Sequence, residues 1–263
     1  MISFLLEFFA TDRRLVFAVI FLGVVMYSLL CGDCYQMIKD IPDNTVDLIV
    51  TDPPYIIDLC GGGQDEISKK KKRQAKELSE ISKGFDLSLF EEFKRIQPKL
   101  NLYIFCSKNQ LRDFINYFDG NYLWDLFVWY KTNAVPSINN NFMPDVEYCF
   151  HARERKVIVH GTTETASHIF VSPTNKADKK KYNHPTPKPT EFIRNIIYNS
   201  SVEGDTILDC FMGSGTTGEV AVDMNRNFIG IEINKEYYDT AKQRIETADK
   251  MANIIKSNEL VLF

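Results

Sequence analysis

The 263-residue sequence predicts an α/β protein with a mostly parallel sheet and helices on both of its faces. Short apolar runs alternate with longer amphipathic ones from residue 27 onward. A glycine-rich turn joins a predicted strand to a predicted helix late in the chain. The composition, 44% hydrophobic and 25% charged, is typical of a globular chain and excludes wholesale disorder.

The individual elements follow from these patterns. The predicted strands are Tyr27–Cys31, Val46–Val50, Leu100–Phe105, Leu123–Trp129, Val146–Phe150, Thr206–Asp209 and Asn227–Glu232. The predicted helices are Leu87–Gln97, Lys108–Phe118, Glu191–Asn199, Thr216–Met224 and a terminal helix from Lys235 to about Lys256. Asn234 is a favourable N-cap for the terminal helix.

Two stretches interrupt this alternation. Residues 56–84 contain three consecutive glycines followed by a run of lysines, which predicts a flexible basic insert. Residues 133–190 are rich in Asn, Pro, Thr and His and show little helical period. Because specificity loops usually lie between sheet elements, we expect residues 137–183 to recognise a ligand.

The N-terminal segment is apolar enough for either of two environments, a membrane or the interior of the sheet. Leu15–Gly32 carries no charge and reaches the lower limit for a membrane span. If Tyr27–Cys31 belongs to the sheet, however, Leu15–Met26 is too short to cross about 30 Å of hydrocarbon. We therefore hypothesise that translation starts at Met26 and that residues 1–25 are not native, with a surface-lying tail and a membrane anchor as alternatives. We expect a cytoplasmic protein, and a peptide from residues 1–25 in the native protein would contradict the proposed start.

The first chemical motif is Asp52-Pro53-Pro54-Tyr55, directly after a predicted buried strand. Two successive prolines fix φ and remove backbone donors, so the chain leaves the sheet as a stiff extended segment. It presents a carboxylate, the Pro53 carbonyl and an aromatic face. This set suits a planar ring with an exocyclic amine, whose two N–H groups need acceptors. The alternative is a plain strand-terminating turn.

The second motif surrounds Gly213, Gly215 and Gly218, which match G-x-G-x-x-G between a strand and a helix. Glu232 ends the next predicted strand, nineteen residues after Gly213, where a carboxylate can accept hydrogen bonds from ribose hydroxyls. This pattern alone is consistent with NAD, FAD or S-adenosylmethionine. Because no Lys-Ser/Thr follows the glycines, it is not a phosphate-binding P-loop.

The position of the glycine motif narrows the choice of cofactor. A dinucleotide-binding fold carries its fingerprint at the start of a long βαβαβ series. Only 45 residues follow Gly218, which is enough for one more strand and one long helix. The rest of the sheet must come from upstream sequence, so the sheet is permuted and NAD is not expected.

The chain resembles the β-class DNA amino-methyltransferases, which carry these two motifs in the same order, D-P-P-Y early and F-x-G-x-G-T-T late. The resemblance extends from Met26 to about residue 250. Three further segments resemble family motifs: Gly32-Asp33-Cys34, Trp129-Tyr-Lys131-Thr-Asn133-Ala-Val-Pro136 and His184-Pro-Thr-Pro-Lys188-Pro189.

This resemblance implies a permuted Rossmann-like methyltransferase sheet over residues 26–263, with target recognition in residues 137–183. It also implies S-adenosylmethionine as cofactor and double-stranded DNA as partner, with methylation at N6 of a flipped-out adenine. The catalytic residues are then Asp52, Pro53, Pro54 and Tyr55. The cofactor-binding residues are Asp33, Asp209, Phe211, Gly213, Gly215, Thr216, Thr217 and Glu232. Thr216 and Thr217 have helix capping as an alternative role.

The net charge of −4 conceals two basic clusters. Residues 69–76 carry six cations and no acid, and residues 176–181 carry four cations and one acid. The two clusters sum to +9, so the rest of the chain has a charge of −13. We expect DNA phosphates to be bound by these clusters and by the segment around Lys131; the alternative is a pair of solvated loops. The predicted DNA-binding residues are Lys69, Lys70, Lys71, Lys72, Arg73, Lys131, Asn133, Lys179, Lys180 and Lys181.

Other reactions remain as alternatives. The family uses S-P-P-Y for cytosine N4, so Asp52 favours adenine N6, and protein-glutamine methyltransferases carry N-P-P-Y. Cytosine C5 chemistry would need a Pro-Cys nucleophile, which this sequence lacks. A non-catalytic DNA-binding relative is the alternative from another class. The family also allows a second copy of the chain and a cognate restriction endonuclease as partners. We expect no metal site, because the histidines and the lone Cys31-x-x-Cys34 pair lack ligand spacing.

Overall fold

The computed structural model describes residues 27–54, 85–134, 142–182, 184 and 186–260. The predictions for residues 1–25, Tyr55, the insert 56–84 and Lys69 to Arg73 lie outside the described residues. Among the described helices, none is long and apolar enough to span a membrane.

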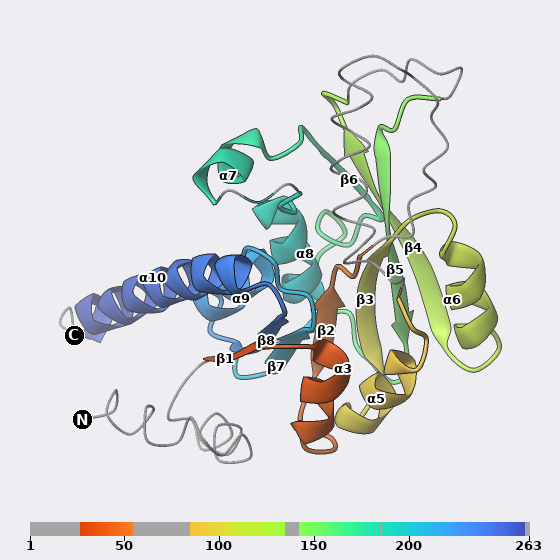
Figure 1. Ribbon diagram of the computed structural model, residues 1–263, viewed down its shortest axis with the longest axis horizontal. Helices are drawn as coiled ribbons and strands as arrows, with labels where there is room; N and C mark the ends of the chain where they lie inside the picture. Colours follow the sequence, from red (N-terminus) through yellow and green to blue (C-terminus); the bar gives the residue numbers. More distant parts are fainter. Residues whose placement is uncertain (1–26, 55–84, 135–141, 183, 185, 261–263) are drawn as a thin grey trace.

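Eight strands of the described chain form one sheet, in the order β1-β8-β7-β2-β3-β5-β4-β6 (Figure 1). The strands are β1 (Tyr27–Cys31), β2 (Leu48–Thr51), β3 (Asn101–Cys106), β4 (Leu123–Lys131), β5 (Val146–Arg153), β6 (Ile169–Ser172), β7 (Thr206–Asp209) and β8 (Asn227–Glu232). Only β5 is antiparallel to its neighbours, β3 and β4. The predicted mostly parallel, permuted sheet is confirmed, because the late strand β7 lies in its middle.

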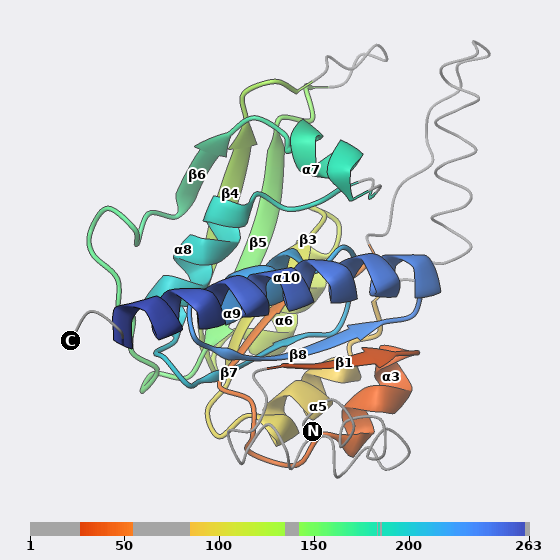
Figure 2. The ribbon, with the colours of Figure 1, turned by 90° about the vertical axis from the view of Figure 1, so that its left-hand side faces the viewer.

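Helices cover both faces of this sheet, as predicted (Figures 1 and 2). One face carries α3 (Cys34–Met37), the 3-10 turn η1 (Ile38–Asp40), α5 (Leu89–Ile96) and α6 (Leu111–Phe118). The other carries α8 (Thr190–Ser200), α9 (Thr216–Asp223) and α10 (Lys235–Leu260). Every residue of β2, β3 and β7 is buried, as expected for parallel strands covered on both sides.

The polar stretch between residues 133 and 190 contains two elements that the pattern did not predict. β6 is an edge strand whose Ile169 and Val171 are exposed, and α7 (Lys176–Lys181) buries no side chain. The same stretch contains β5, which lies inside the sheet between β3 and β4. Residues 137–183 are therefore not one continuous insert outside the sheet.

The connections change direction between β7 and β2. From β7 the chain passes through α9 to β8, whereas from β2 it passes through α5 to β3, and the two helices lie on opposite faces. At such a point the loops diverge and leave a crevice beyond the carboxyl ends of the strands, where open α/β sheets bind ligands. The Asp-Pro-Pro motif leaves β2 and the glycine motif leaves β7 at this point.

Candidate active site

The loop between β7 and α9 brings backbone close to neighbouring elements. Gly213 and Gly215 adopt φ of +50° and +80°, in the left-handed region that favours glycine. A Cβ on Gly213 would lie 2.9 Å from Nε2 of His184, and one on Gly215 would lie 3.0 Å from the Cα of Ala241. Only glycine therefore fits this tight loop, as the motif predicted.

Asp209 is the last residue of β7, and its carboxylate is hydrogen-bonded to the loop between β7 and α9. Its Oδ1 accepts hydrogen bonds from the Thr51 hydroxyl at 3.0 Å and the Phe211 N–H at 3.1 Å. Its Oδ2 accepts the Thr217 hydroxyl at 2.8 Å. Asp209 thus joins β2, the glycine loop and α9. Burial raises the pKa of Asp209 to about 7, although these hydrogen bonds oppose the shift.

This raised pKa predicts a pH-dependent stability. The folded chain retains the Asp209 proton between pH 3.8, the ordinary pKa, and about 7, whereas the unfolded chain loses it near the ordinary pKa. The free energy of unfolding should therefore contain a contribution that falls as pH rises through this window. The isosteric substitution Asp209→Asn should remove this contribution. Urea unfolding of both proteins at pH 5 and pH 8 measures it, and an identical pH dependence would contradict the assignment.

The two threonines of the glycine motif do not cap α9 with their side chains. The N-cap of α9 is Gly215, which makes no side-chain capping hydrogen bond. The Thr217 hydroxyl donates to Asp209, and the Thr216 hydroxyl accepts from Arg244 at 2.9 Å. The capping alternative is therefore wrong, and both hydroxyls fix the loop from its buried side.

Two carboxylates lie at the ends of β8 and β1. Glu232 accepts the N–H groups of Gly213 and Asn234, each at 2.8 Å. Its own carbonyl accepts the N–H of Gly32, which places the exposed Asp33 beside it. Burial raises the pKa of Glu232. Asp33 caps α3 through the N–H of Tyr35 at 3.0 Å.

The Asp-Pro-Pro motif begins a chain of four alternating charges. Asp52 Oδ2 lies 2.5 Å from Nζ of Lys188, which lies 2.6 Å from Oε1 of Glu147. Oε2 of Glu147 lies 2.7 Å from Nζ of Lys131. Pro53, which follows Asp52, is buried. This chain of charges thus joins segments from β2, β4, β5 and the loop before α8.

Each buried charge in this chain is compensated by its neighbours. Burial alone would raise the pKa of Glu147, but the ammonium groups of Lys188 and Lys131 hold it at about 2. Burial would lower the pKa of Lys188, but the carboxylates of Asp52 and Glu147 raise it above its ordinary value. Lys188 also lies over the Phe105 ring, 4.9 Å from its centroid. The arrangement fixes Lys188 as a cation beside Asp52.

The predicted DNA-binding residues fall into two groups in the structure. Lys179, Lys180 and Lys181 are exposed on α7. Lys131 is paired with Glu147, and the Asn133 side chain accepts the N–H of Thr174 at 2.8 Å, which ties the end of β4 to the segment before α7. The structure thus gives Lys131 and Asn133 internal partners and leaves the α7 lysines facing solvent.

Lys188 and Glu147 were not predicted as site residues. The sequence around each residue is unusual, because Glu147 is a charged residue in an apolar strand and Lys188 lies between two prolines. Their pairing joins positions 41 residues apart in the chain and is visible only in three dimensions. In the part of the chain that the structure describes, no cluster of His, Cys, Asp and Glu could hold a metal ion.

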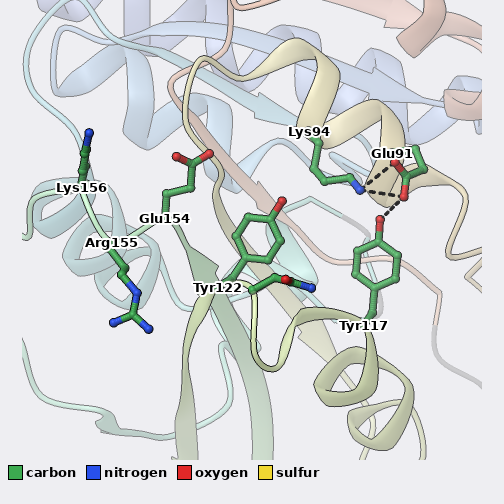
Figure 3. A pocket seen from close by; sticks show the side chains of 8 residues that line it. Glu91, Lys94, Tyr117, Tyr122, Glu154, Arg155 and Lys156 are labelled. Carbon is green, nitrogen blue, oxygen red and sulfur yellow. Dashed lines mark hydrogen bonds and ion pairs between the residues drawn. The ribbon is translucent and has the colours of Figure 1, made fainter.

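Two cavities lie at opposite ends of β4 and β5. The first, of about 400 Å³, adjoins the candidate site, and its lining includes Trp129, Lys131, Glu147 and Lys179. The second, of about 700 Å³, lies by the start of β4 and the end of β5, away from the Asp-Pro-Pro motif (Figure 3). There Lys94 and Tyr117 both bind Glu91. We assign no chemistry to the second cavity.

Comparisons with known proteins agree with this geometry. The DNA methylase family matches residues 46–243. Type II methyltransferase M.HinfI of Haemophilus influenzae is 27% identical over 265 residues, covering 87% of this chain and 71% of the relative. A crystal structure of the M1.HpyAVI–SAM complex is 27% identical with a TM-score of 0.62, covering 83% of this chain and 100% of that chain.

The fold also matches a second type of enzyme. The PvuII DNA methyltransferase, described as cytosine-N4-specific, has a TM-score of 0.64 at 18% identity, covering 87% of this chain and 92% of that chain. At this identity the likeness concerns the fold alone. The family model matches about three quarters of this chain. The chain therefore belongs to the DNA methylase family and is an S-adenosylmethionine-dependent DNA methyltransferase.

Proposed function

We propose that this protein transfers a methyl group from S-adenosylmethionine to the exocyclic N6 of an adenine in double-stranded DNA. The observation that carries the proposal is the position of Asp52. It leaves β2 beside the glycine loop of β7, and Lys188 holds its carboxylate in place. An amine bound at this carboxylate would lie next to a cofactor bound over the glycine loop.

The residues of the glycine loop and the adjacent strand ends fit the cofactor. Gly213 and Gly215 let the loop turn with left-handed φ and pack closely against His184 and Ala241, and the cofactor would bind over the backbone of this tight turn. Glu232 would accept hydrogen bonds from the ribose hydroxyls, and Asp33 would accept one from the adenine amine of the cofactor. Phe211 would pack under the methionine portion. S-adenosylmethionine, when bound, supplies an electrophilic methyl group.

The Asp-Pro-Pro-Tyr segment would bind the target base. The base must leave the duplex to reach the site, at a cost of a few kcal/mol. Tyr55 would stack on the extruded adenine and recover part of that cost. Asp52 and the Pro53 carbonyl would accept the two N6 hydrogens, which directs the nitrogen lone pair toward the methyl group. Methylation makes the nitrogen cationic, and it would then release one of its protons past the Asp52 carboxylate to solvent. Orientation and electrostatics then supply most of the acceleration.

The exposed lysines of α7, together with Lys69 to Arg73, would bind DNA phosphates. Recognition of a specific sequence is assigned to residues 137–183. A homodimer and a cognate restriction endonuclease remain predictions from the family resemblance.

A labelled-methyl assay tests the proposed function. The protein is incubated with S-adenosylmethionine carrying tritium in its methyl group and with unmethylated DNA, and the DNA is then digested to nucleosides. Label in N6-methyladenine is the expected result. Label in N4-methylcytosine would show that the methylated base is cytosine and not adenine. No label in any DNA or protein would contradict the proposal.

Replacing Glu232 with alanine tests the cofactor assignment. The variant should bind S-adenosylmethionine about 10- to 100-fold more weakly, which corresponds to the loss of hydrogen bonds to a charged group. DNA affinity should change much less. Calorimetry with each ligand measures both effects, and Glu236→Ala on the exposed side of α10 is the matched control. A larger loss of DNA affinity than of cofactor affinity would reject the assignment.

A further inference from the structure

Arg244 of α10 is a buried cation that contacts the glycine loop. Its side chain is only 1% exposed. Its Nη1 donates to the Thr216 hydroxyl at 2.9 Å and to the Ser214 carbonyl at 3.4 Å. Its Nε and Nη2 donate to Oε2 of Glu219 at 2.8 and 2.6 Å. The guanidinium therefore fixes both the loop and the first turn of α9 to α10.

The same guanidinium contacts the segment that carries the exposed lysines. Its Nη2 lies 3.5 Å from Oδ2 of Asp178 on α7, and its central carbon lies 4.1 Å from the centroid of the Tyr182 ring. Lys179, Lys180 and Lys181 lie between these two contact residues in the sequence. In Figures 1 and 2, α7 accordingly lies beside the first half of α10.

A second contact ties this segment to the glycine loop. His184, two residues after Tyr182, is packed so closely over Gly213 that a Cβ there would lie 2.9 Å from its Nε2. Its ring also contacts Tyr237 of α10, with centroids 4.7 Å apart. The lysine-bearing segment is thus attached to the cofactor loop at both Arg244 and His184.

We propose that Arg244 is a positioning residue that couples DNA binding at α7 to cofactor binding at the glycine loop. This inference rests on the proposed function, which assigns DNA to the α7 lysines. Phosphates bound there would order α7 and fix Asp178 against Arg244, and Arg244 would in turn fix Ser214 and Thr216. Because the guanidinium fork has a fixed geometry, order at one end restricts the other. The first ligand then bears an ordering cost that the second avoids, which gives positive cooperativity.

Calorimetry on the full chain tests the coupling. S-adenosylhomocysteine, which has no methyl group to transfer, is titrated into the protein alone and with saturating sheared, unmethylated DNA. We expect DNA to tighten its binding about fivefold or more, within the usual range of coupling between sites. By linkage, saturating S-adenosylhomocysteine should tighten DNA binding by the same factor.

Asp178→Asn separates coupling from simple structural support. It removes the charge that faces Arg244 on the α7 side and leaves the bonds of Arg244 to Ser214, Thr216 and Glu219 in place. The side-chain oxygen of asparagine can still accept the hydrogen bond from Nδ2 of Asn175, which Asp178 accepts at 2.6 Å. We expect near-wild-type affinity for S-adenosylhomocysteine without DNA and loss of the DNA-dependent tightening. The control Asp223→Asn alters another aspartate–arginine pair, with Arg194 at 2.7 Å, and should keep the full tightening.

The outcomes distinguish the two proposals. A wild-type chain that binds both ligands without tightening would overturn the coupling, as would an Asp178→Asn variant that tightens like wild type. Either result leaves the proposed methyl transfer intact. A wild-type chain that binds neither ligand would overturn the proposed function and the coupling together.

Discussion

Replacing Asp52 with alanine is expected to lower the rate of methyl transfer by at least about 10³-fold, because the target amine would lose the acceptor that orients it. S-adenosylmethionine affinity is expected to stay near that of wild type, since Glu232 and the glycine loop are unchanged. Single-turnover transfer of a labelled methyl group measures the first effect, and calorimetry measures the second.

The control for this substitution is Asp125→Ala. It makes the same chemical change on β4, where the Asp125 carboxylate faces His168 at 3.5 Å, and it should leave transfer unchanged. Persistent turnover in the Asp52 variant would show that another group orients the amine. Equal losses of transfer and of cofactor affinity would show that Asp52 supports the cofactor site instead.

Replacing Lys188 with methionine is expected to lower the free energy of unfolding by about 3–5 kcal/mol, the usual cost of breaking a buried ion pair by removing one partner. Methionine fills a similar volume, so the loss reports the charge. Asp52 and Glu147 would then lie near each other without the cation that separates them. Urea unfolding at pH 7.5 measures the change.

Two further variants test this explanation. Lys242→Met removes a surface lysine 3.9 Å from Glu246 and should change stability by less than about 0.5 kcal/mol. The double variant Lys188→Met with Asp52→Asn should regain part of the loss, because the carboxylate that loses its cation is neutralised while the pair between Glu147 and Lys131 stays in place. A loss below about 1 kcal/mol for Lys188→Met alone would contradict a buried, mutually dependent charge chain.

The sequence predicted the bounds of three strands correctly because their apolar runs end at turn-forming residues. β1, β7 and β8 have the predicted bounds. Asp209 and Glu232 are the last residues of β7 and β8, and Asp33 lies two residues after the end of β1. β6 escaped prediction because an exposed edge strand of four residues lacks a clear pattern. α7 escaped because it buries nothing, so no hydrophobic period marks it.

The sequence predicted those site residues that are carboxylates at the ends of strands. Asp52 follows β2, and Asp209 and Glu232 are the last residues of β7 and β8. Parallel strands bring their carboxyl ends to one edge of the sheet. Lys188 and Arg244 were missed because their partners lie in distant segments, and the spacing of residues in the sequence does not show which distant segments meet. The hydrogen bond from Thr217 to Asp209 was missed although the two residues are close in the sequence, because the tight turn of the glycine loop brings them together.

The central claim, sequence-specific methylation of adenine N6, is tested most directly by reading modified bases in DNA from a strain that expresses the protein. We predict N6-methyladenine at one short recurring sequence, and its absence from a strain that expresses the Asp52→Ala variant at the same level. DNA without that mark, or with the same mark in both strains, would contradict the account.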